Sequence, residues 1–195
     1  KDVMPFDLQI TSEVTVKTPG ILGCTMIETP NGLVRAEALS AGDMIMTRDN
    51  GAVPLTSVVL NRRPATEMAA PITINAGAFG DHEDVVIAPG QRVLIESGLA
   101  ELFFGDIEVL VEGRHLLDSA YVRQLPEAAM VTYVQLVCSQ PELVEANGIT
   151  LECCVAADVP RVAVEGICRD RTESPRLVLR HHEAEVLVHG FEEKK

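Results

Sequence analysis

The sequence is poor in aromatic residues, and this scarcity narrows the range of partners. It contains no tryptophan, two tyrosines and five phenylalanines, so that aromatic residues make up 4% of the 195 residues. Single-stranded nucleic acids stack their bases on aromatic side chains, and all nucleic acids attract positive charge. With few aromatic rings and a net charge of −13, this acidic chain is not expected to bind nucleic acid.

Long apolar runs are absent as well. A helix that spans a bilayer needs about 20 consecutive apolar residues, and no stretch of this sequence approaches that length. The N-terminal residues KDVMPFDLQI lack the charged-then-apolar layout of a secretory signal. We therefore expect no membrane insertion and predict a soluble protein.

The cysteines do not form a recognisable framework. An odd number without a C-x-x-C pair is a poor basis for disulfides or for a zinc site. We therefore expect free thiols in a reducing compartment, with the cytoplasm as the default location, and no cofactor. The five residues are Cys24, Cys138, Cys153, Cys154 and Cys168.

What the sequence does contain is a series of short β-type segments. Hydrophobic residues make up 47% of the chain, enough for a substantial core. Short runs rich in Val, Ile and Thr, separated by turn residues, are typical of an all-β domain. We predict strands at residues 14–17, 25–29, 33–35, 44–48, 52–62, 72–75, 85–87, 92–96, 107–110, 121–124, 130–136 and 143–146.

Turn residues separate these segments. Residues 30–32, Pro-Asn-Gly, predict a tight hairpin turn because Asn and Gly tolerate positive φ. Residues 49–51, Asp-Asn-Gly, repeat the pattern. The remaining expectations are helical turns at 37–39 and 112–117, a strand at 159–167, a linker at 169–175, and either a helix or a strand at 176–188.

The most informative pattern lies at residues 25–49. They read TMIETPNGLVRAEALSAGDMIMTRD, a strand, turn, strand arrangement. This stretch resembles the opening of the Hint domain, the self-cleaving module shared by hedgehog proteins and inteins, in its bacterial variety. Later motifs of the same family are matched in the same order by residues 71–80, 88–94, 101–118, 131–136 and 142–148.

The resemblance implies a Hint fold, a disk-like or horseshoe arrangement of short antiparallel strands with hairpins. We predict three parts. Residues 1–17 form an N-terminal extension or leading strand, residues 18–152 the Hint-like β domain, and residues 153–195 a C-terminal extension that packs on or continues that domain. Related bacterial domains occur in secreted proteins, so the resemblance adds secretion as an alternative to the cytoplasm.

The resemblance also implies a chemistry. In the family, a Cys at the start of the domain attacks the carbonyl of the preceding residue and converts a peptide bond into a thioester. A His from a Thr/Ser-x-x-His motif donates a proton to the departing amide nitrogen. Imidazole suits this step because it gives and takes a proton near neutral pH.

Each of these positions is altered in this sequence. Gly20 stands at the nucleophile, Gln91 and Gln135 stand at two family His positions, and Pro141 stands at a third. Glutamine forms hydrogen bonds but does not transfer protons. Because groups that act as a unit fail as a unit, we predict a degenerate domain without autoprocessing activity. We expect it to serve as a binding or structural module, with a protein as a possible partner.

The alternative to a degenerate domain is an active one that uses Cys24 as its nucleophile. It follows Gly23, and it would act from a shifted position through an N–S acyl shift at the Gly23–Cys24 bond. A small apolar residue packed beside a strand is the competing interpretation of this Cys. Asp118 matches a family Asp and is a further catalytic candidate, although an Asp that closes a β segment also forms turns.

Three other clusters are candidates for metal or redox sites. On a helix, His181, Glu185 and His189 would share one face at four-residue spacing, but a solvated charged face is the favoured interpretation. Residues 81–84, Asp-His-Glu-Asp, lack the order of a calcium loop. Residues 153–154, Cys-Cys, are inert unless exposed. We therefore predict no metal.

Overall fold

A computed structural model describes residues 17–155 and 174–192, which fold into two β-sheets with few helices. The predicted all-β class is confirmed. In the first sheet the strands run β11 (Val122–Gln124), β7 (Ile72–Ile74), β8 (Val85–Ile87), β1 (Ile21–Leu22), β12 (Ala128–Cys138) and β15 (Cys154–Val155), and β6 (Ser57–Ala65) pairs with β12.

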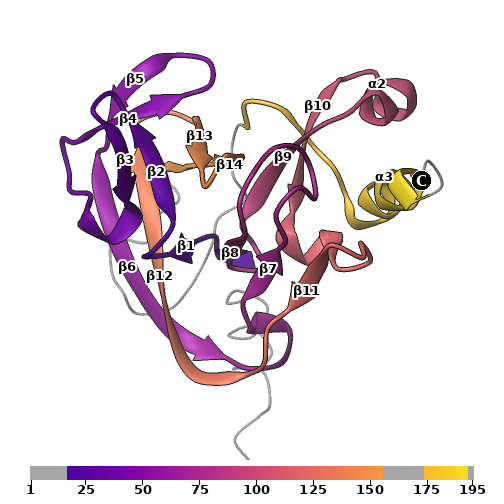
Figure 1. The fold of residues 1–195 in the computed structure, drawn as a ribbon, viewed down its shortest axis with the longest axis horizontal. Coiled ribbons are helices and arrows are strands. Elements are labelled where there is room, and N and C mark those ends of the chain that lie inside the picture. The colour runs from indigo at the N-terminus through magenta and orange to yellow at the C-terminus, as the bar shows by residue number, and fades with distance from the viewer. Residues whose placement is uncertain (1–16, 156–173, 193–195) are drawn as a thin grey trace, which may run out of the picture.

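The second sheet contains the opening motif. Its strands run β16 (Leu177–Val178), β10 (Glu108–Glu112), β9 (Arg92–Glu96), β14 (Ile149–Glu152), β13 (Leu143–Ala146), β2 (Met26–Thr29) and β3 (Gly32–Arg35), while β4 (Met44–Thr47) pairs with β13 and with β5 (Gly51–Pro54). Pairing is antiparallel except at β10 with β16 and at β12 with β15. Figure 1 shows the β2–β3 and β4–β5 hairpins at the left and the α-helices at the right.

The two predicted hairpin turns form by the same device. In β2–β3 the Thr29 hydroxyl donates to the Gly32 carbonyl at 2.6 Å, and in β4–β5 the Thr47 hydroxyl donates to the Gly51 carbonyl at 2.8 Å. Gly32 and Gly51 both have positive φ, at 106° and 65°. A threonine at the strand end and a glycine after the turn therefore fix the register of each hairpin.

The single strand predicted at residues 52–62 is wrong in one respect, because it is two strands. β5 ends at Pro54, which has no N–H to continue a ladder. The next two amides bond elsewhere: Leu55 N donates to Asp43 O at 2.9 Å and Thr56 N donates to Val137 O at 2.7 Å. The chain thus passes from the second sheet to the first at residues 55–56.

A helix that was not predicted, α2 (Gly98–Phe104), lies before β10. Its signals are present in the sequence. The Ser97 side chain accepts from Leu99 N at the N-terminus, and Gly105 closes the helix with φ 81°. The predicted helical turns appear as the 3-10 turns η1 (Ala36–Ala38) and η3 (Gly113–Leu116), and a third, η2 (Glu67–Ala69), follows β6.

The ambiguous segment 176–188 contains both of its alternatives. β16 is followed by α3 (His181–Glu192), whose start is marked by Arg180 N donating to the Glu183 carboxylate at 2.7 Å. α3 packs against α2 and η3, and a Cβ at Gly190 would lie 3.1 Å from Leu99. The strand predicted at 159–167 lies outside the described residues, as do most of the strand predicted at 14–17 and of the linker predicted at 169–175.

The core is aliphatic, as the composition predicts. Both sheets contribute to one large cluster of buried Ile, Val, Leu and Ala side chains, which also takes in Leu187 and Val188 of α3. Tyr133 of β12 is the one aromatic residue among the largest fully buried side chains of the described region. In the same region no helix combines the length and apolar character needed to cross a membrane.

Candidate functional site

The candidate site surrounds the peptide bond that leads into β1. The amide of Gly20 donates to Gln91 Oε1 at 3.0 Å, and the carbonyl of Pro19 accepts from Gln135 Nε2 at 2.9 Å. Both glutamines are buried, with 3% and 6% of their surface exposed. We call this pair of side chains the glutamine clamp, because it holds both polar ends of the Pro19–Gly20 peptide group.

Two elements bring the clamp together. Gln91 lies in the turn between β8 and β9, where its backbone N–H donates to Ala88 O at 2.9 Å. Gln135 lies in the middle of β12, the strand that pairs with β1 through Ile21 and Val134. The same turn also binds Gly20 directly, since Ala88 N donates to Gly20 O at 2.8 Å.

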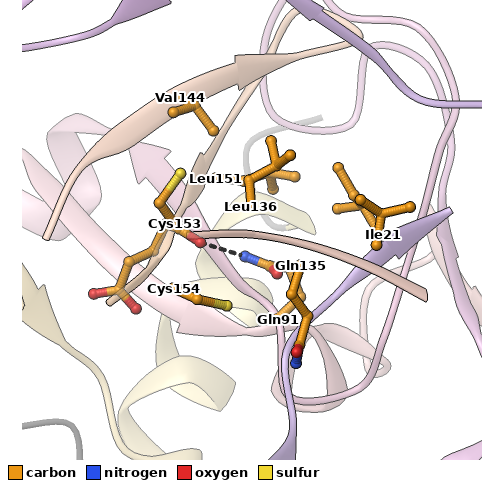
Figure 2. Close-up of a pocket in the computed structure, with 10 residues that line it drawn as sticks. Ile21, Gln91, Gln135, Leu136, Val144, Leu151, Cys153 and Cys154 are labelled. Carbon is orange, nitrogen blue, oxygen red and sulfur yellow. Dashed lines mark hydrogen bonds between the residues drawn. The ribbon is translucent and has the colours of Figure 1, made fainter. Parts of the chain in front are cut away.

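The orientation of the Gln91 amide follows from its other partners. Its Nε2 donates to the carbonyl of Glu152 at 2.9 Å and to that of Arg92 at 3.1 Å. The dashed line in Figure 2 marks the first of these bonds. Because both donor bonds go to carbonyls, the remaining oxygen faces the Gly20 amide as an acceptor.

The residues just before the clamp are also fixed. Arg63 of β6 is buried, and its Nη2 donates to Thr18 O at 3.0 Å. Its guanidinium lies 4.4 Å from the centre of the Tyr133 ring, a cation–π arrangement. Burial lowers the pKa of Arg63, and the neighbouring Tyr133 opposes that shift. A Cβ at Gly90 would lie 2.2 Å from the Lys17 carbonyl, so the backbone of residue 17 packs directly against this glycine.

Gly20 has no room for a side chain. A Cβ at this position would lie 2.7 Å from Tyr133 Cβ, a distance at which something must shift, and the residue has φ 155°. Tyr133 itself is fully buried. The position at which the resemblance predicts the nucleophile is therefore occupied by a residue whose small size the packing requires.

A small cavity lies beside the clamp. Its volume is about 20 Å³, close to that of a single water molecule. Figure 2 shows the residues around it. Its polar lining comes from Gln91, Gln135, Glu152, Cys153 and Cys154, and its apolar lining from Ile21, Val134, Leu136, Val144 and Leu151. This cavity has no space for a separate substrate.

The Cys153 thiol at the cavity is a poor nucleophile. A hydrogen bond with Cys138 and complete burial raise the pKa of Cys153 well above its ordinary value. The thiolate is the reactive form of cysteine, so this side chain stays protonated and unreactive at neutral pH. Cys138 and Cys154 are buried too and form no disulfide.

Cys24 lies apart from the clamp, in the turn between β1 and β2. Its side chain is exposed, and it does not line the cavity. The carbonyl of Gly23 accepts from Glu37 N at 3.0 Å, and a Cβ at Gly23 would lie 2.5 Å from a Glu37 carboxylate oxygen. The clamp thus holds the Pro19–Gly20 bond and not the Gly23–Cys24 bond.

The other candidate residues do not join the clamp. Asp118 is exposed in the turn between η3 and β11, and Pro141 lies in the loop before β13.

Within residues 17–155 and 174–192, no group of three or more His, Cys, Asp and Glu side chains is placed to hold a metal ion. In the acidic turn at residues 81–84, Asp84 accepts from Ala76 N at 2.7 Å and so supports the loop.

The sequence interpretation missed Arg63, Tyr133 and Glu152. Tyr133 stands two residues before Gln135 in the same motif, and alternation along a strand places both on one side. Glu152 acts through its backbone carbonyl, which carries no sequence signal. Arg63 lies one residue beyond the strand predicted at 52–62, whereas the observed strand β6 continues to Ala65.

Comparison with known proteins supports the resemblance found in the sequence. A family model described as Hint domain matches residues 20–158. No curated protein shows a significant match. Among solved structures, the MchDnaB-1 intein has 11% identity and a TM-score of 0.46 over 68% of this chain and 98% of its own. The gp41-1 intein has 10% identity and a TM-score of 0.43 over 69% and 98%.

Proposed function

Because the chain belongs to the Hint domain family, we propose that it is a Hint-type module that has lost self-cleavage and holds its leading segment, residues 17–20, in place. The observation that carries this proposal is the glutamine clamp around a peptide bond that ends in glycine. Residues 18–152 then form the Hint-like part, residues 1–17 an N-terminal extension and residues 153–195 a C-terminal extension.

The lack of a nucleophile and the direction of the Gln91 hydrogen bond argue against cleavage. Self-cleavage needs a nucleophile on the residue after the bond, and Gly20 has no side chain. It also needs an acid that protonates the departing nitrogen. Gln91 presents an oxygen to the Gly20 N–H at 3.0 Å, so it accepts a hydrogen bond where a donor is required.

The other half of the clamp stabilises the intact peptide. Gln135 donates to the Pro19 carbonyl at 2.9 Å, in the position where an oxyanion would develop during attack. Without a nucleophile, the same bond only satisfies a buried carbonyl. A buried peptide group with both polar ends paired is stable, because an unpaired end would cost about 1–3 kcal/mol.

What remains is a positioning role. Thr18, Pro19 and Gly20 are each bound through backbone atoms, by Arg63, by Gln135, and by Gln91 with Ala88. Whatever lies upstream of residue 17 therefore leaves the domain from a fixed point. We propose that the module acts as a scaffold or binding module on this basis, with a protein as its possible partner.

An active domain that uses Cys24 is the second candidate. Its exposed thiol favours it, because a reactive cysteine has to be accessible. The reaction would be an N–S acyl shift at the Gly23–Cys24 bond. Against it stands the absence of Cys24 from the cavity that the clamp lines.

Intact-mass measurement distinguishes the two. Purified protein is incubated with dithiothreitol or hydroxylamine, which would capture a thioester, and the expected result is one unchanged mass. Fragments that end at Gly23 and vanish in Cys24→Ala would support the second candidate. A fragment that ends at Pro19 would overturn the loss of self-cleavage at the clamp itself.

A further inference from the structure

We propose that residues 174–180, the C-terminal strap, lock the glutamine clamp through Glu152. The strap lies outside the part of the chain that matches the family, residues 20–158. The proposal rests on the proposed function, because it concerns how firmly the clamp holds Gly20. It assigns Glu152 and Ser174 as positioning residues of the clamp.

Glu152 is the junction between the strap and the clamp. It ends β14, and only 4% of it is exposed. Its carbonyl accepts from Gln91 Nε2 at 2.9 Å, and its carboxylate accepts from Arg92 at 3.2 Å and from the Ser174 hydroxyl at 2.5 Å. One residue therefore joins the strap to the side chain that binds Gly20.

The strap has a second, independent attachment. Arg176 donates to Glu108 and to Asp49, with the latter bond at 2.7 Å, and Leu179 N donates to Leu110 O at 2.8 Å. Next to them, β16 pairs in parallel with β10. The strap thus stays in place when Ser174 is changed, so that the effect of Ser174 on Glu152 can be measured alone.

The physical argument concerns a buried charge. A carboxylate removed from water depends on its hydrogen bonds, and it relaxes toward other partners or water when one bond is lost. The Glu152 backbone would move with its side chain, and Gln91 would lose a fixed acceptor for its amide. The other end of that amide holds Gly20, so the clamp would loosen.

The consequence is a connection between the two ends of the described chain. The hydrogen bonds run from Ser174 to Glu152, from Glu152 to Gln91, and from Gln91 to Gly20. A partner that lifts the strap from Glu152 would free the leading segment without touching it. We assign this role to the strap because it contacts Glu152, the partner of Gln91, from outside the Hint-like part.

Hydrogen exchange of the Gly20 amide in the full chain tests the proposal. In Ser174→Ala we expect this amide to exchange about tenfold faster, as the loss of one charge-assisted hydrogen bond implies. Amides of the β2–β3 hairpin should keep their rates. Ser174→Thr retains the hydroxyl and should restore slow exchange at Gly20.

Ser97→Ala is the matched control, because it removes a serine hydroxyl that caps α2 and has no connection to the clamp. It should leave the Gly20 amide unchanged. Equal acceleration in Ser97→Ala and Ser174→Ala, or no acceleration in Ser174→Ala, would overturn the lock. Intact mass of the same samples separates the two ideas, since cleavage at Pro19 would contradict the proposed function, while unchanged exchange contradicts only the lock.

Discussion

The two ends of the described chain are held by different forces. The Pro19–Gly20 peptide group is bound by two neutral side-chain amides inside the protein, whereas the strap and α3 add surface ion pairs and a pair of histidines to their strand pairing and apolar packing. Buried hydrogen bonds between uncharged groups depend little on salt or pH, while surface charges are screened by salt and histidines titrate. The two hydrogen bonds of the clamp should therefore depend less on salt and pH than the contacts of Arg176 and His115.

The largest effect is expected from Gly20→Cys. Its Cβ would lie 2.7 Å from Tyr133 Cβ, and overpacking of this kind costs about 3 kcal/mol. Urea unfolding should show this loss, and intact mass should show no cleavage because Gln91 still supplies no proton. Gly20→Ala is the control for the added Cβ alone. A cleaved product ending at Pro19 would contradict the degenerate site.

Removing one half of the clamp comes next. Gln135→Leu leaves the buried Pro19 carbonyl without a donor, which should lower the free energy of unfolding by about 2 kcal/mol. Gln140→Leu is the matched control, because it makes the same change on an exposed residue of the turn after β12, and such changes stay within about 0.5 kcal/mol. Similar losses in both variants would mean that the clamp adds no stability of its own.

Acidification should weaken the attachment of α3 at the C-terminal end of the described chain. The His115 and His181 rings lie 5.0 Å apart between η3 and α3. Burial lowers the pKa of His115 below 6.5, with Arg114 and His181 acting in the same direction and Glu112 and Glu185 opposing. As the pH falls, His115 is therefore protonated in the unfolded chain before it is protonated in the folded protein. Its contribution to the free energy of unfolding is fully present above pH 6.5 and is lost as the pH falls toward the folded-state pKa.

The expected loss is less than about 1 kcal/mol between roughly pH 7.5 and pH 5, because this side chain is only partly buried. It should be measured as faster amide exchange in α3, with Gly20 unchanged. His115→Gln removes the titrating group and should flatten the dependence. If that variant retains the full pH dependence, His115 is not its source.

The sequence predicted the fold better than the site. Alternating residues and Asn-Gly turns fix the hairpins locally, so β2, β3, β4 and β13 appear where they were expected. The family motifs also placed Gln91 and Gln135, whose side chains meet at one peptide bond.

What the sequence did not predict depends on contacts between distant residues. The Gln91 to Glu152 bond uses a backbone carbonyl 61 residues away, and no residue pattern marks such a partner. The break in the strand predicted at 52–62 likewise depends on Asp43 and Val137, which draw residues 55–56 toward different sheets. Local patterns carry neither kind of information.

The smallest effect is expected from the ion pairs of the strap. Arg176 bridges Asp49 and Glu108, and its side chain is about a quarter exposed. Burial would raise the pKa of Glu108, but the hydrogen bonds from Arg176 and Arg48 outweigh it and leave the pKa below its ordinary value. Pairs this close to water contribute about 0.5 kcal/mol, and roughly 1 M salt screens much of it.

Arg176→Gln should therefore lower stability slightly at low salt and have almost no effect at high salt. Urea unfolding at both salt concentrations measures this difference. Gln135→Leu serves as the comparison, since its cost should be the same at both. A salt-dependent cost for Gln135→Leu, or a salt-independent one for Arg176→Gln, would contradict the division between a neutral clamp and a charged strap. The division requires both results together, because only the strap relies on charges that water and ions can reach.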